Sequence, residues 1–236
     1  MNFKDAVVLV TGANRGLGKA LAEAALKAGA RKVYGAARNP EAVTTPGVTP
    51  IKLDVTNPAD VAAAAQAIPD LTILINNAGI STGSGVTTED SLNTARKEME
   101  TNFFGPMALS LAFAPVLKKN GGGAIVNILS ALSWISLPST GTYSISKSAA
   151  WALTNGLRGE LAEQKTHVMG AHMGYMDTDM TAGVDAPKSA PADIAQFIVT
   201  ALEAGEDEAL TDETSRQVKQ GFSAPRAAYL GAPLAK

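Results

Sequence analysis

The stretch AVVLVTGANRGLG, residues 6–18, joins an apolar run to three glycines and an arginine. The apolar run is typical of a buried strand, and Gly12-x-x-x-Gly16-x-Gly18 then opens a segment with helical spacing. In a strand-to-helix turn, glycine permits positive φ angles and lets a phosphate approach the backbone without meeting a Cβ. The helix that follows presents free N–H groups and its positive dipole end to that phosphate. The stretch therefore predicts a dinucleotide pyrophosphate cradle, with a tight turn that only packs the helix closely as the alternative.

Short β-branched runs alternate with longer segments of helical spacing along the rest of the chain. Strands are predicted at 6–10, 32–36, 50–53, 71–75, 123–129 and 166–171, with 208–211 as a weak seventh. Helices are predicted at 17–28, 58–67, 91–119 with an interruption near Gly105-Pro106, 142–164 and 191–204. This alternation is typical of a parallel sheet covered on both faces. We expect one α/β domain over residues 1–236, a Rossmann-type doubly wound sheet of six to seven strands, with a substrate loop near 174–191.

Composition narrows the classes of partner. The 236 residues carry 20 Lys and Arg against 22 Asp and Glu, so neither a nucleic acid nor an anionic membrane is an expected partner. No stretch reaches the roughly 18 apolar residues of a membrane span, and the first residues are too short for a secretory signal. The chain has no cysteine, and His167 and His172 are a poor basis for a metal cluster, so no metal is expected. We therefore expect a cytoplasmic protein.

The residues that follow the second predicted strand bear on the choice of cofactor. Sites that take NAD usually place an acidic residue there for the ribose 2′-hydroxyl, whereas this chain has Ala37 and then Arg38. A guanidinium suits the oxygens of a 2′-phosphate, and Arg15 in the glycine loop offers a second one. The pattern favours NADP(H), with Arg38 as a solvated surface charge as the alternative. Asp54 either accepts from the adenine amino group or caps the helix entered at Pro58.

Tyr143 and Lys147 lie four residues apart in a predicted helix, so their side chains share one face. A nearby ammonium favours the phenolate and is expected to lower the pKa of Tyr143 toward the working pH, as a general acid or base requires. Ser130 closes the predicted strand at 123–129, and open α/β sheets bind ligands at the carboxyl ends of their strands. Its hydroxyl is expected to hydrogen-bond a substrate carbonyl while Tyr143 gives the proton.

Together these motifs resemble the short-chain dehydrogenase/reductase family over nearly the whole chain. The matching elements, in order, are Thr11-Gly12-x-x-x-Gly16-x-Gly18, Asn76-Asn77-Ala78-Gly79, Asn102, Ser130 and Tyr143-x-x-x-Lys147. The resemblance implies that Tyr143 is the catalytic acid or base, and that Lys147 lowers its pKa and binds the nicotinamide ribose. It also implies that Ser130 orients the substrate and that Asn102 supports a water-linked proton relay. Arg15 with Arg38 is similar to the pattern of NADP-preferring members, which include carbonyl reductases.

The resemblance also implies a set of cofactor-binding residues. Asn77 and Gly79 would lie near the adenine ribose, and Thr178 would contact the nicotinamide or the pyrophosphate. The full expected set is Gly12, Asn14, Arg15, Gly16, Leu17, Gly18, Arg38, Asp54, Val55, Asn77, Ala78, Gly79, Tyr143, Lys147, Gly174, Met176 and Thr178.

Two stretches depart from the family pattern. After the sixth strand the family commonly has Pro-Gly, whereas this chain has Met173-Gly174, so a more mobile loop is expected. The C-terminus also lacks the glycine-rich turn that often follows the seventh strand. The C-terminal departure affects the final strand and the floor of the substrate site, so the family pattern does not predict these parts.

The expected substrate pocket is apolar. Its candidates are Leu132, Trp134, Leu137, Met176 and Met180, each of which also fits a core or oligomer contact. Such a lining favours a hydrophobic ketone or aldehyde over a polyol or sugar phosphate. His172 is expected to be a hydrogen-bonded structural histidine, with an approach to the nicotinamide as the alternative.

The sequence thus predicts NADPH-dependent reduction of an apolar ketone or aldehyde to the alcohol. An NAD-dependent alcohol dehydrogenase and a non-catalytic NADP(H)-binding regulatory protein are the alternatives. The predicted central helices, at 91–119 and 142–164, carry apolar surface that suits the homodimer or homotetramer implied by the resemblance.

Overall fold

A computed structural model describes residues 2–231 of the chain. Within these residues, the strands that form one sheet are β1 (Val7–Thr11), β2 (Lys32–Ala37), β3 (Val48–Lys52), β4 (Ile73–Asn76), β5 (Gly123–Ile128), β6 (Thr166–His172) and β7 (Glu208–Leu210). All neighbours are parallel, in the order β3-β2-β1-β4-β5-β6-β7. The chain winds outward in opposite directions from β1 and β4, and ligands of such sheets bind at the carboxyl ends of the strands at this switch point. The fold class predicted from the sequence is confirmed.

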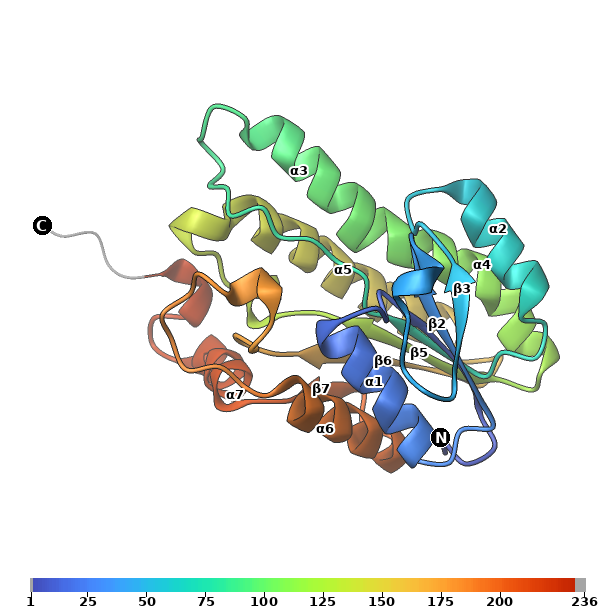
Figure 1. The fold of residues 1–236 in the computed structure, drawn as a ribbon. Coiled ribbons are helices and arrows are strands. Elements are labelled where there is room, and N and C mark those ends of the chain that lie inside the picture. Colours follow the sequence, from blue (N-terminus) through green and yellow to red (C-terminus); the bar gives the residue numbers. More distant parts are fainter. Residues whose placement is uncertain (1, 232–236) are drawn as a thin grey trace, which may run out of the picture.

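Helices cover both faces of this sheet, as Figure 1 shows. On one face, α1 (Gly16–Lys27) and α6 (Pro191–Ala204) pack against each other. On the other face lie α2 (Pro58–Ala67), α4 (Gly105–Lys119) and α5 (Gly141–Glu160). The sheet is therefore the middle of three layers, with a hydrophobic core on each side.

Strand β1 shows why the inner strands are mostly apolar. Val8 and Val10 belong to the core that includes Leu21 of α1, whereas Val7 and Leu9 belong to the core that includes Phe113 of α4. Successive side chains of a strand point to opposite faces, and both faces are covered here, so no position of β1 is left for a solvated residue.

The predicted interruption of the long helix lies one turn earlier than expected. Helix α3 (Ser91–Met99) passes into α4 through a π-helical segment, Glu100–Phe104, rather than breaking at Gly105-Pro106. Single π-helical turns inside α-helices occur often at functional sites. This segment carries Asn102, one of the residues expected in the catalytic centre.

The predicted strand bounds lie within two residues of the observed ones. One predicted helix is too long, and one observed helix was not predicted. Helix α5 ends at Glu160 instead of 164, because the chain turns there and Lys165 takes a positive φ of 60°. Helix α7 (Glu213–Gln220) was not predicted, because its sequence is almost entirely polar and buries only Ser215. Its N-terminus does carry a capping box between Asp212 and Ser215, which is a recognisable start signal.

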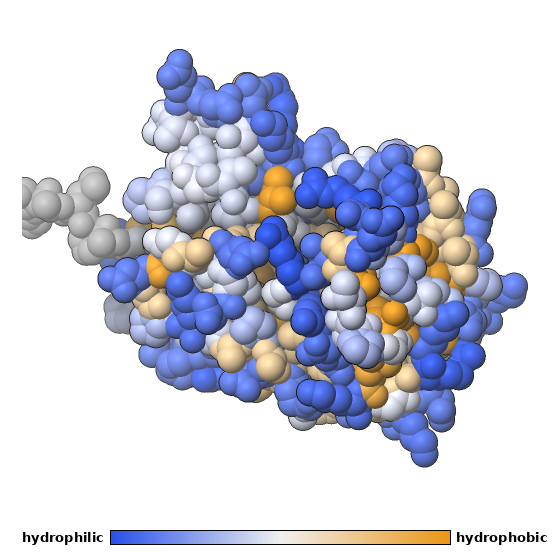
Figure 2. Space-filling model, in the orientation of Figure 1, coloured by the Kyte–Doolittle hydropathy of each residue, from blue (hydrophilic) through white to orange (hydrophobic). Residues whose placement is uncertain are grey.

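No helix within residues 2–231 combines the length and the apolar character that a membrane crossing requires. The face seen in Figure 2 is largely hydrophilic, with hydrophobic residues in small groups between the charged ones.

Candidate active site

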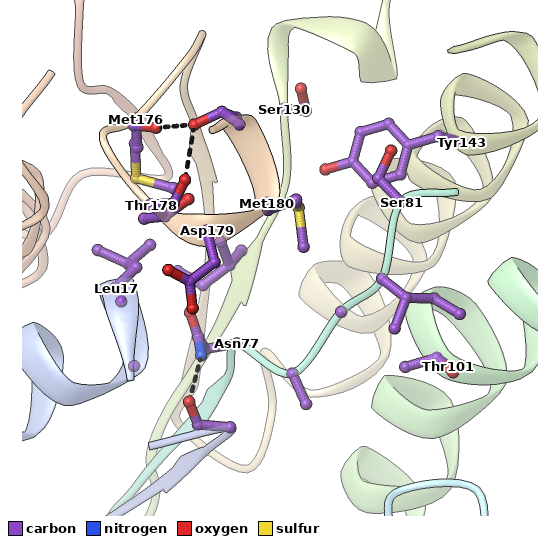
Figure 3. A pocket seen from close by; sticks show the side chains of 18 of the residues that line it. Leu17, Asn77, Ser81, Thr101, Ser130, Tyr143, Met176, Thr178, Asp179 and Met180 are labelled. Atoms are coloured by element: carbon purple, nitrogen blue, oxygen red, sulfur yellow. Dashed lines mark hydrogen bonds between the residues drawn. The ribbon is translucent and has the colours of Figure 1, made fainter. Parts of the chain in front are cut away.

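A cleft with a volume of about 1120 Å³ lies at the carboxyl ends of β1, β2, β4, β5 and β6. This volume exceeds the roughly 300–1,000 Å³ that is usual for small-molecule pockets. Figure 3 shows Tyr143 and Ser81 on one side, Leu17, Met176 and Thr178 on the other, and Met180 between them. The cleft therefore has room for a ligand larger than a single small metabolite.

The glycine loop forms the β1 end of the cleft. Gly12 and Gly16 have positive φ angles of 66° and 54°, which side-chain-bearing residues rarely adopt. A Cβ on Gly18 would lie 2.1 Å from the main-chain oxygen of Gly12, so only glycine lets α1 pack this close to β1. These positions show the tight turn and the close helix packing, which both interpretations of the stretch require, and the phosphate cradle stays a prediction.

Thr11 and Asn77 tie the glycine loop to the residues that follow β4. The Thr11 hydroxyl oxygen accepts hydrogen bonds from the main-chain N–H groups of Asn77 and Ala78, at 2.9 and 3.0 Å. The Asn77 side-chain amide donates to the main-chain oxygen of Thr11 at 2.8 Å. Asn77 thus lines the cleft, but its amide nitrogen is already used to hold the loop in place.

The far end of the cleft carries two arginines. Arg38 lies directly after β2 and is exposed, and no carboxylate within the described chain lies at ion-pair distance from it. Arg15 instead forms an ion pair with Asp179 at 2.7 Å, and both side chains are more than two thirds exposed. Because exposed pairs of this kind contribute little to stability, Arg15 can exchange Asp179 for another anion at small cost.

Asp54 does not cap the helix entered at Pro58, which was one of its two expected roles. The side chain of Asn57 caps α2 by accepting from the N–H of Ala59. Asp54 closes a local turn instead, accepting from the N–H and the hydroxyl of Thr56 at 3.0 and 2.7 Å. These hydrogen bonds hold the pKa of Asp54 below its usual range, and Arg38 adds to the effect. The carboxylate lines the cleft, so a contact with a ligand amino group remains a prediction.

Ser130, Tyr143 and Lys147 come together where β5 ends against α5. Tyr143 and Ser130 both line the cleft, and the Ser130 hydroxyl donates to the main-chain oxygen of Met173 at 3.4 Å. The Lys147 ammonium donates to the main-chain oxygen of Ile128 at 2.8 Å and lies 5.7 Å from the centre of the Tyr143 ring. The side chains expected to share one helix face therefore do so, at the predicted edge of the sheet.

The pKa of Tyr143 differs from the expectation. Burial raises it above its ordinary value of 10.0, the buried carboxylate of Glu98 raises it further, and the nearby Ser130 side chain lowers it in part. Burial also lowers the pKa of Lys147 to about 8. In the protein alone, desolvation therefore outweighs the attraction between ammonium and phenolate, and Tyr143 is held protonated. A protonated phenol is the form that donates a proton to a carbonyl oxygen.

Asn102 holds the segment that follows β4 by hydrogen bonds. Its Oδ1 accepts from the N–H of Ile80 at 2.9 Å, and its Nδ2 donates to the oxygen of Ile80 and to the Ser146 hydroxyl, at 2.8 and 2.9 Å. A Cβ on Gly79 would lie 3.2 Å from Asn102 Oδ1 and 3.6 Å from Lys147 Nζ. Asn102 therefore sits beside Lys147 but does not line the cleft, and its part in a proton relay stays a prediction.

Glu98 is a site residue that the sequence analysis missed. It is fully buried, and its Oε1 accepts from the N–H and the hydroxyl of Thr82, both at 2.8 Å. Its Oε2 has no hydrogen-bond partner among the described residues. Glu98 precedes Asn102 by one helical turn, so the two side chains hold neighbouring parts of the cleft wall, at Thr82 and Ile80. A carboxylate four residues before Asn102 was the signal in the sequence.

The apolar part of the cleft contains four of the five expected residues, Leu132, Leu137, Met176 and Met180. Trp134 is the exception, and this corrects the expectation. The turn Ala131–Ser133 directs Trp134 back into the protein, where it is 7% exposed and stacks on His172 with ring centroids 3.7 Å apart. His172 is buried and hydrogen-bonded, as expected, and does not line the cleft.

The predicted substrate loop is closed at its base and anchored by α7. Asp177 donates its N–H to the oxygen of Ser189 at 3.0 Å, and Ser189 donates to the oxygen of Tyr175 at 2.9 Å. Asp212, which caps α7, accepts from the N–H of Gly174 at 2.6 Å. The unpredicted helix therefore supports the floor of the site, where the Pro-Gly pair is missing.

Residues 2–231 contain no group of three or more His, Asp and Glu side chains placed to hold a metal ion.

Comparison with known proteins agrees with this geometry. A family model described as short chain dehydrogenase matches residues 6–189. Dehydrogenase/reductase SDR family member 7B from Bos taurus is 36% identical over 197 residues, which are 75% of this chain and 60% of that protein. The chain thus spans about three fifths of the length of the bovine relative. The 3-oxoacyl-(acyl-carrier-protein) reductase FabG from Vibrio cholerae is 32% identical over 201 residues, covering 78% of this chain and 79% of that protein.

Solved structures extend the similarity to the whole chain. The structure of a short chain dehydrogenase from Burkholderia cenocepacia in complex with NADP is 42% identical to this chain. It has a TM-score of 0.93 and covers 99% of this chain and 100% of its own. A short-chain dehydrogenase from Streptomyces avermitilis is 27% identical, with a TM-score of 0.79 over 93% of each chain.

Proposed function

The chain belongs to the short-chain dehydrogenase/reductase family, and on that premise we propose that it reduces a neutral, apolar ketone or aldehyde to the alcohol with NADPH. One observation carries the proposal. Tyr143 and Ser130 line the same cleft as the glycine loop. A protein that only senses a nucleotide has no need of a positioned proton donor beside it.

The residues of the cleft fit a dinucleotide diphosphate. Arg15 is the N-cap of α1 and makes no side-chain cap hydrogen bond, so the first N–H groups of the helix are left for a ligand. Gly12 and Gly16, with their positive φ angles, make the turn that brings the backbone to that point. A helix N-terminus reached through a glycine turn is a favourable site for a pyrophosphate, so the family and the local geometry agree.

The preference for NADP(H) rests on Arg38. An acidic residue at this position would repel a 2′-phosphate, whereas the exposed guanidinium of Arg38 attracts one and can bond two of its oxygens. Arg15 provides a second cation once it leaves Asp179. The complex of the Burkholderia cenocepacia relative with NADP supports this assignment.

When bound, the dinucleotide supplies or accepts the hydride. The chain's own residues handle the proton and the carbonyl oxygen. Tyr143 donates its hydroxyl proton to the oxygen as negative charge develops there, and the Ser130 hydroxyl donates a hydrogen bond to the same oxygen. Lys147, as an ammonium, stabilises the phenolate that Tyr143 becomes. Gly79, which leaves room beside Lys147, and Asn102 hold this arrangement from the β4 side.

The substrate class follows from the walls of the cleft near Tyr143. Ala131, Leu132, Ile135, Leu137 and Met180 contribute apolar side chains, and Ser81 and Thr82 contribute neutral polar ones. Among residues 2–231, no arginine or lysine other than Lys147 lines this part to hold a substrate carboxylate or phosphate. These walls support a neutral carbonyl compound with apolar substituents.

Oxidation of an alcohol with NAD is the second candidate, and one observation favours it. Asp179 neutralises Arg15, which leaves Arg38 as the single unpaired cation among the described residues at the far end of the cleft. A weaker attraction for the 2′-phosphate would permit NAD as well.

We also propose that the protein is a cytoplasmic homodimer or homotetramer that pairs through α4 and α5. Leu111 on α4 is 76% exposed and Ile145 on α5 is 49% exposed, and Phe104 and Met107 are exposed nearby. Phe104, Met107 and Leu111 are three and four residues apart, so they lie on one side of the helix, and exposed apolar side chains of this kind suit contact with a second copy. Sedimentation velocity of wild type and of Leu111→Glu tests the pairing, and a monomeric wild type would contradict it.

The test of the reaction is NADPH consumption against a panel of carbonyl compounds. The panel contains acetophenone, 2-octanone and benzaldehyde, with glucose and pyruvate as polar and charged comparisons, and each is measured with NADPH and with NADH. We expect turnover of the first three and kcat/KM at least about tenfold higher with NADPH. Tight NADPH binding without turnover of any carbonyl would contradict the proposal and favour a sensor.

A further inference from the structure

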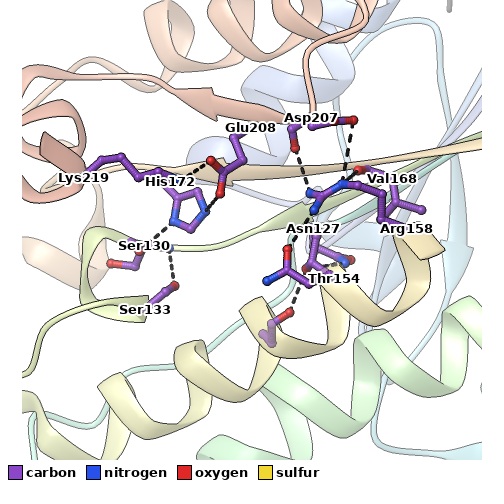
Figure 4. Close-up of polar contacts among 12 residues, drawn as sticks. Asn127, Ser130, Ser133, Thr154, Arg158, Val168, His172, Asp207, Glu208 and Lys219 are labelled. Atoms are coloured by element: carbon purple, nitrogen blue, oxygen red, sulfur yellow. Dashed lines mark hydrogen bonds and ion pairs between the residues drawn. The ribbon is translucent and has the colours of Figure 1, made fainter. Parts of the chain in front are cut away.

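His172 ends β6 and is fully buried, yet it contacts the backbone of Ser130 from outside the cleft. Its Nδ1 lies 3.1 Å from the main-chain oxygen of Ser130, and its ring stacks on Trp134 with 16° between the planes. Figure 4 shows the imidazole between the Ser130 turn and the carboxylate of Glu208. No step of the proposed reaction uses this histidine.

The contacts of the ring select one tautomer. A main-chain carbonyl oxygen only accepts hydrogen bonds, so Nδ1 must carry the hydrogen. Burial lowers the pKa of His172 to about 4, so the ring is neutral at pH 7 and Nε2 holds a lone pair. In agreement, Nε2 has no hydrogen-bond partner within the described residues, and Oε1 of Glu208 stays 3.9 Å away from it.

The neighbours of His172 keep this tautomer in place. The other carboxylate oxygen of Glu208 forms an ion pair with Lys219 of α7, whose ammonium also lies 5.0 Å over the Trp134 ring. Because Lys219 neutralises Glu208, the carboxylate does not draw the imidazole proton to Nε2. Stacking on Trp134 fixes the plane of the ring, so the N–H points at the Ser130 oxygen.

The Ser130 oxygen belongs to the turn that sets the direction of the Ser130 side chain. The same oxygen accepts from the N–H of Ser133 at 2.9 Å, and the Ser130 hydroxyl oxygen accepts from the N–H of Leu132 at 3.1 Å. A rotation of the Ser130 peptide group would break the contact with Ser133 and change the turn that carries the Ser130 hydroxyl.

We propose that His172 is a positioning residue for the reaction: its Nδ1–H holds the Ser130 carbonyl and thereby aims the Ser130 hydroxyl at the substrate. The inference rests on the proposed function, because the aim of Ser130 matters only if Ser130 and Tyr143 act on a carbonyl. Glu208, Lys219 and Trp134 support His172, which gives α7 an indirect part in the catalytic centre.

The kinetic test compares His172→Asn with His172→Leu. The two replacements have similar shapes and both lose the stacked ring, but only asparagine keeps a donor near the position of Nδ1. With the fastest ketone of the panel, we expect kcat of His172→Leu to be about tenfold below that of His172→Asn, because small misplacements of a catalytic group are costly. KM and the Kd for NADPH should agree within about twofold, since neither the pocket nor the glycine loop changes.

His167→Asn is the control, because His167 lies at the opposite end of β6 and contacts Asp207 at 3.3 Å. It should keep the wild-type kcat. Equal kcat values for His172→Asn and His172→Leu would overturn the proposal.

A second measurement needs no turnover, and its result is read on the wild type. Long-range ¹H–¹⁵N spectra of the full-length wild type should show His172 as the Nδ1–H tautomer, with His172→Asn used only to assign its signals. The Nε2–H tautomer would overturn the proposal, because a bare Nδ1 cannot donate to Ser130. Failure of the wild type to reduce any carbonyl, with the Nδ1–H tautomer present, would instead reject the proposed function and leave the contact with Ser130 intact.

Discussion

Gly12, Gly16 and Gly18 present mainly backbone at the β1 end of the cleft, where Thr11 and Asn77 hold the loop, whereas the end near β5 and β6 presents side chains from distant parts of the chain. At the first end, a Cβ on Gly18 would strike the Gly12 carbonyl. At the second, the Ser130 carbonyl depends on His172, and Gly174 depends on Asp212.

The two ends of the cleft should respond differently to amino-acid substitutions. A site made of bare backbone fails when an atom is added, because the added atom has nowhere to go. A site made of side chains fails when an atom that donates or accepts is removed, because its partner stays buried and unpaired. The same cleft should therefore show opposite sensitivities at its two ends.

The largest effect is expected for Gly18→Ala, which adds one Cβ at the backbone end. The contact of 2.1 Å with the Gly12 oxygen cannot be relieved without moving α1 from β1, so the free energy of unfolding should fall by more than about 3 kcal/mol. Urea denaturation measures this. The matched control is Gly156→Ala in α5, where a Cβ meets nothing within 4 Å, and stability should rise by about 0.5–1 kcal/mol. Equal effects of the two changes would remove the distinction between the ends.

Arg38→Asp tests the role of charge at the β1 end of the cleft, because an exposed side chain can be replaced there without changing the fold. A carboxylate there repels the 2′-phosphate and can accept from a 2′-hydroxyl, so the NADPH to NADH ratio in kcat/KM should fall about 100-fold. Parallel initial-rate measurements with both cofactors check this. An unchanged ratio would remove Arg38 from the phosphate site.

A smaller effect is expected for Lys147, at the side-chain end of the cleft. It is measured as the change of the free energy of unfolding with pH. Burial lowers its pKa from 10.5 to about 8, so above pH 8 the unfolded chain binds more protons than the folded one, and stability must rise with pH. The free energy of unfolding should increase by about 2 kcal/mol between pH 8 and pH 10. The pKa of Tyr143 is raised, so its opposing effect begins only above about pH 10.

Urea denaturation at several pH values measures this rise, and Lys147→Met is the comparison. Its stability should lack the increase of the wild type. A wild-type profile that is flat from pH 8 to pH 10 would show that Lys147 is not desolvated.

The contrast between the two ends also separates what the sequence could predict from what it could not. The glycine loop is a local constraint, readable from neighbouring residues, and the alternation of strands and helices gave the sheet within two residues of its bounds. Tyr143 and Lys147 could be paired because helical spacing puts positions four apart on one face. By contrast, Trp134 was misplaced, because its stacking on His172 joins residues 38 positions apart in the sequence.

The same reason accounts for the other misses. Helix α7 is polar and short, so its role became visible only when Asp212 was found against Gly174. Glu98 precedes Asn102 by one turn, but only burial makes its carboxylate relevant to Tyr143. The raised pKa of Tyr143 likewise depends on how much water is excluded, which spacing in a helix does not reveal.

The most direct test of the proposed reaction compares wild type with Tyr143→Phe, which removes one oxygen from the side-chain end of the cleft. NADPH oxidation with the fastest ketone of the panel gives kcat, and quenching of tryptophan fluorescence by NADPH gives Kd. We expect kcat to fall at least about 1,000-fold, as loss of a general acid and its hydrogen bonds allows, while the Kd for NADPH changes less than about threefold. Turnover by Tyr143→Phe within about tenfold of wild type would contradict Tyr143 as the proton donor.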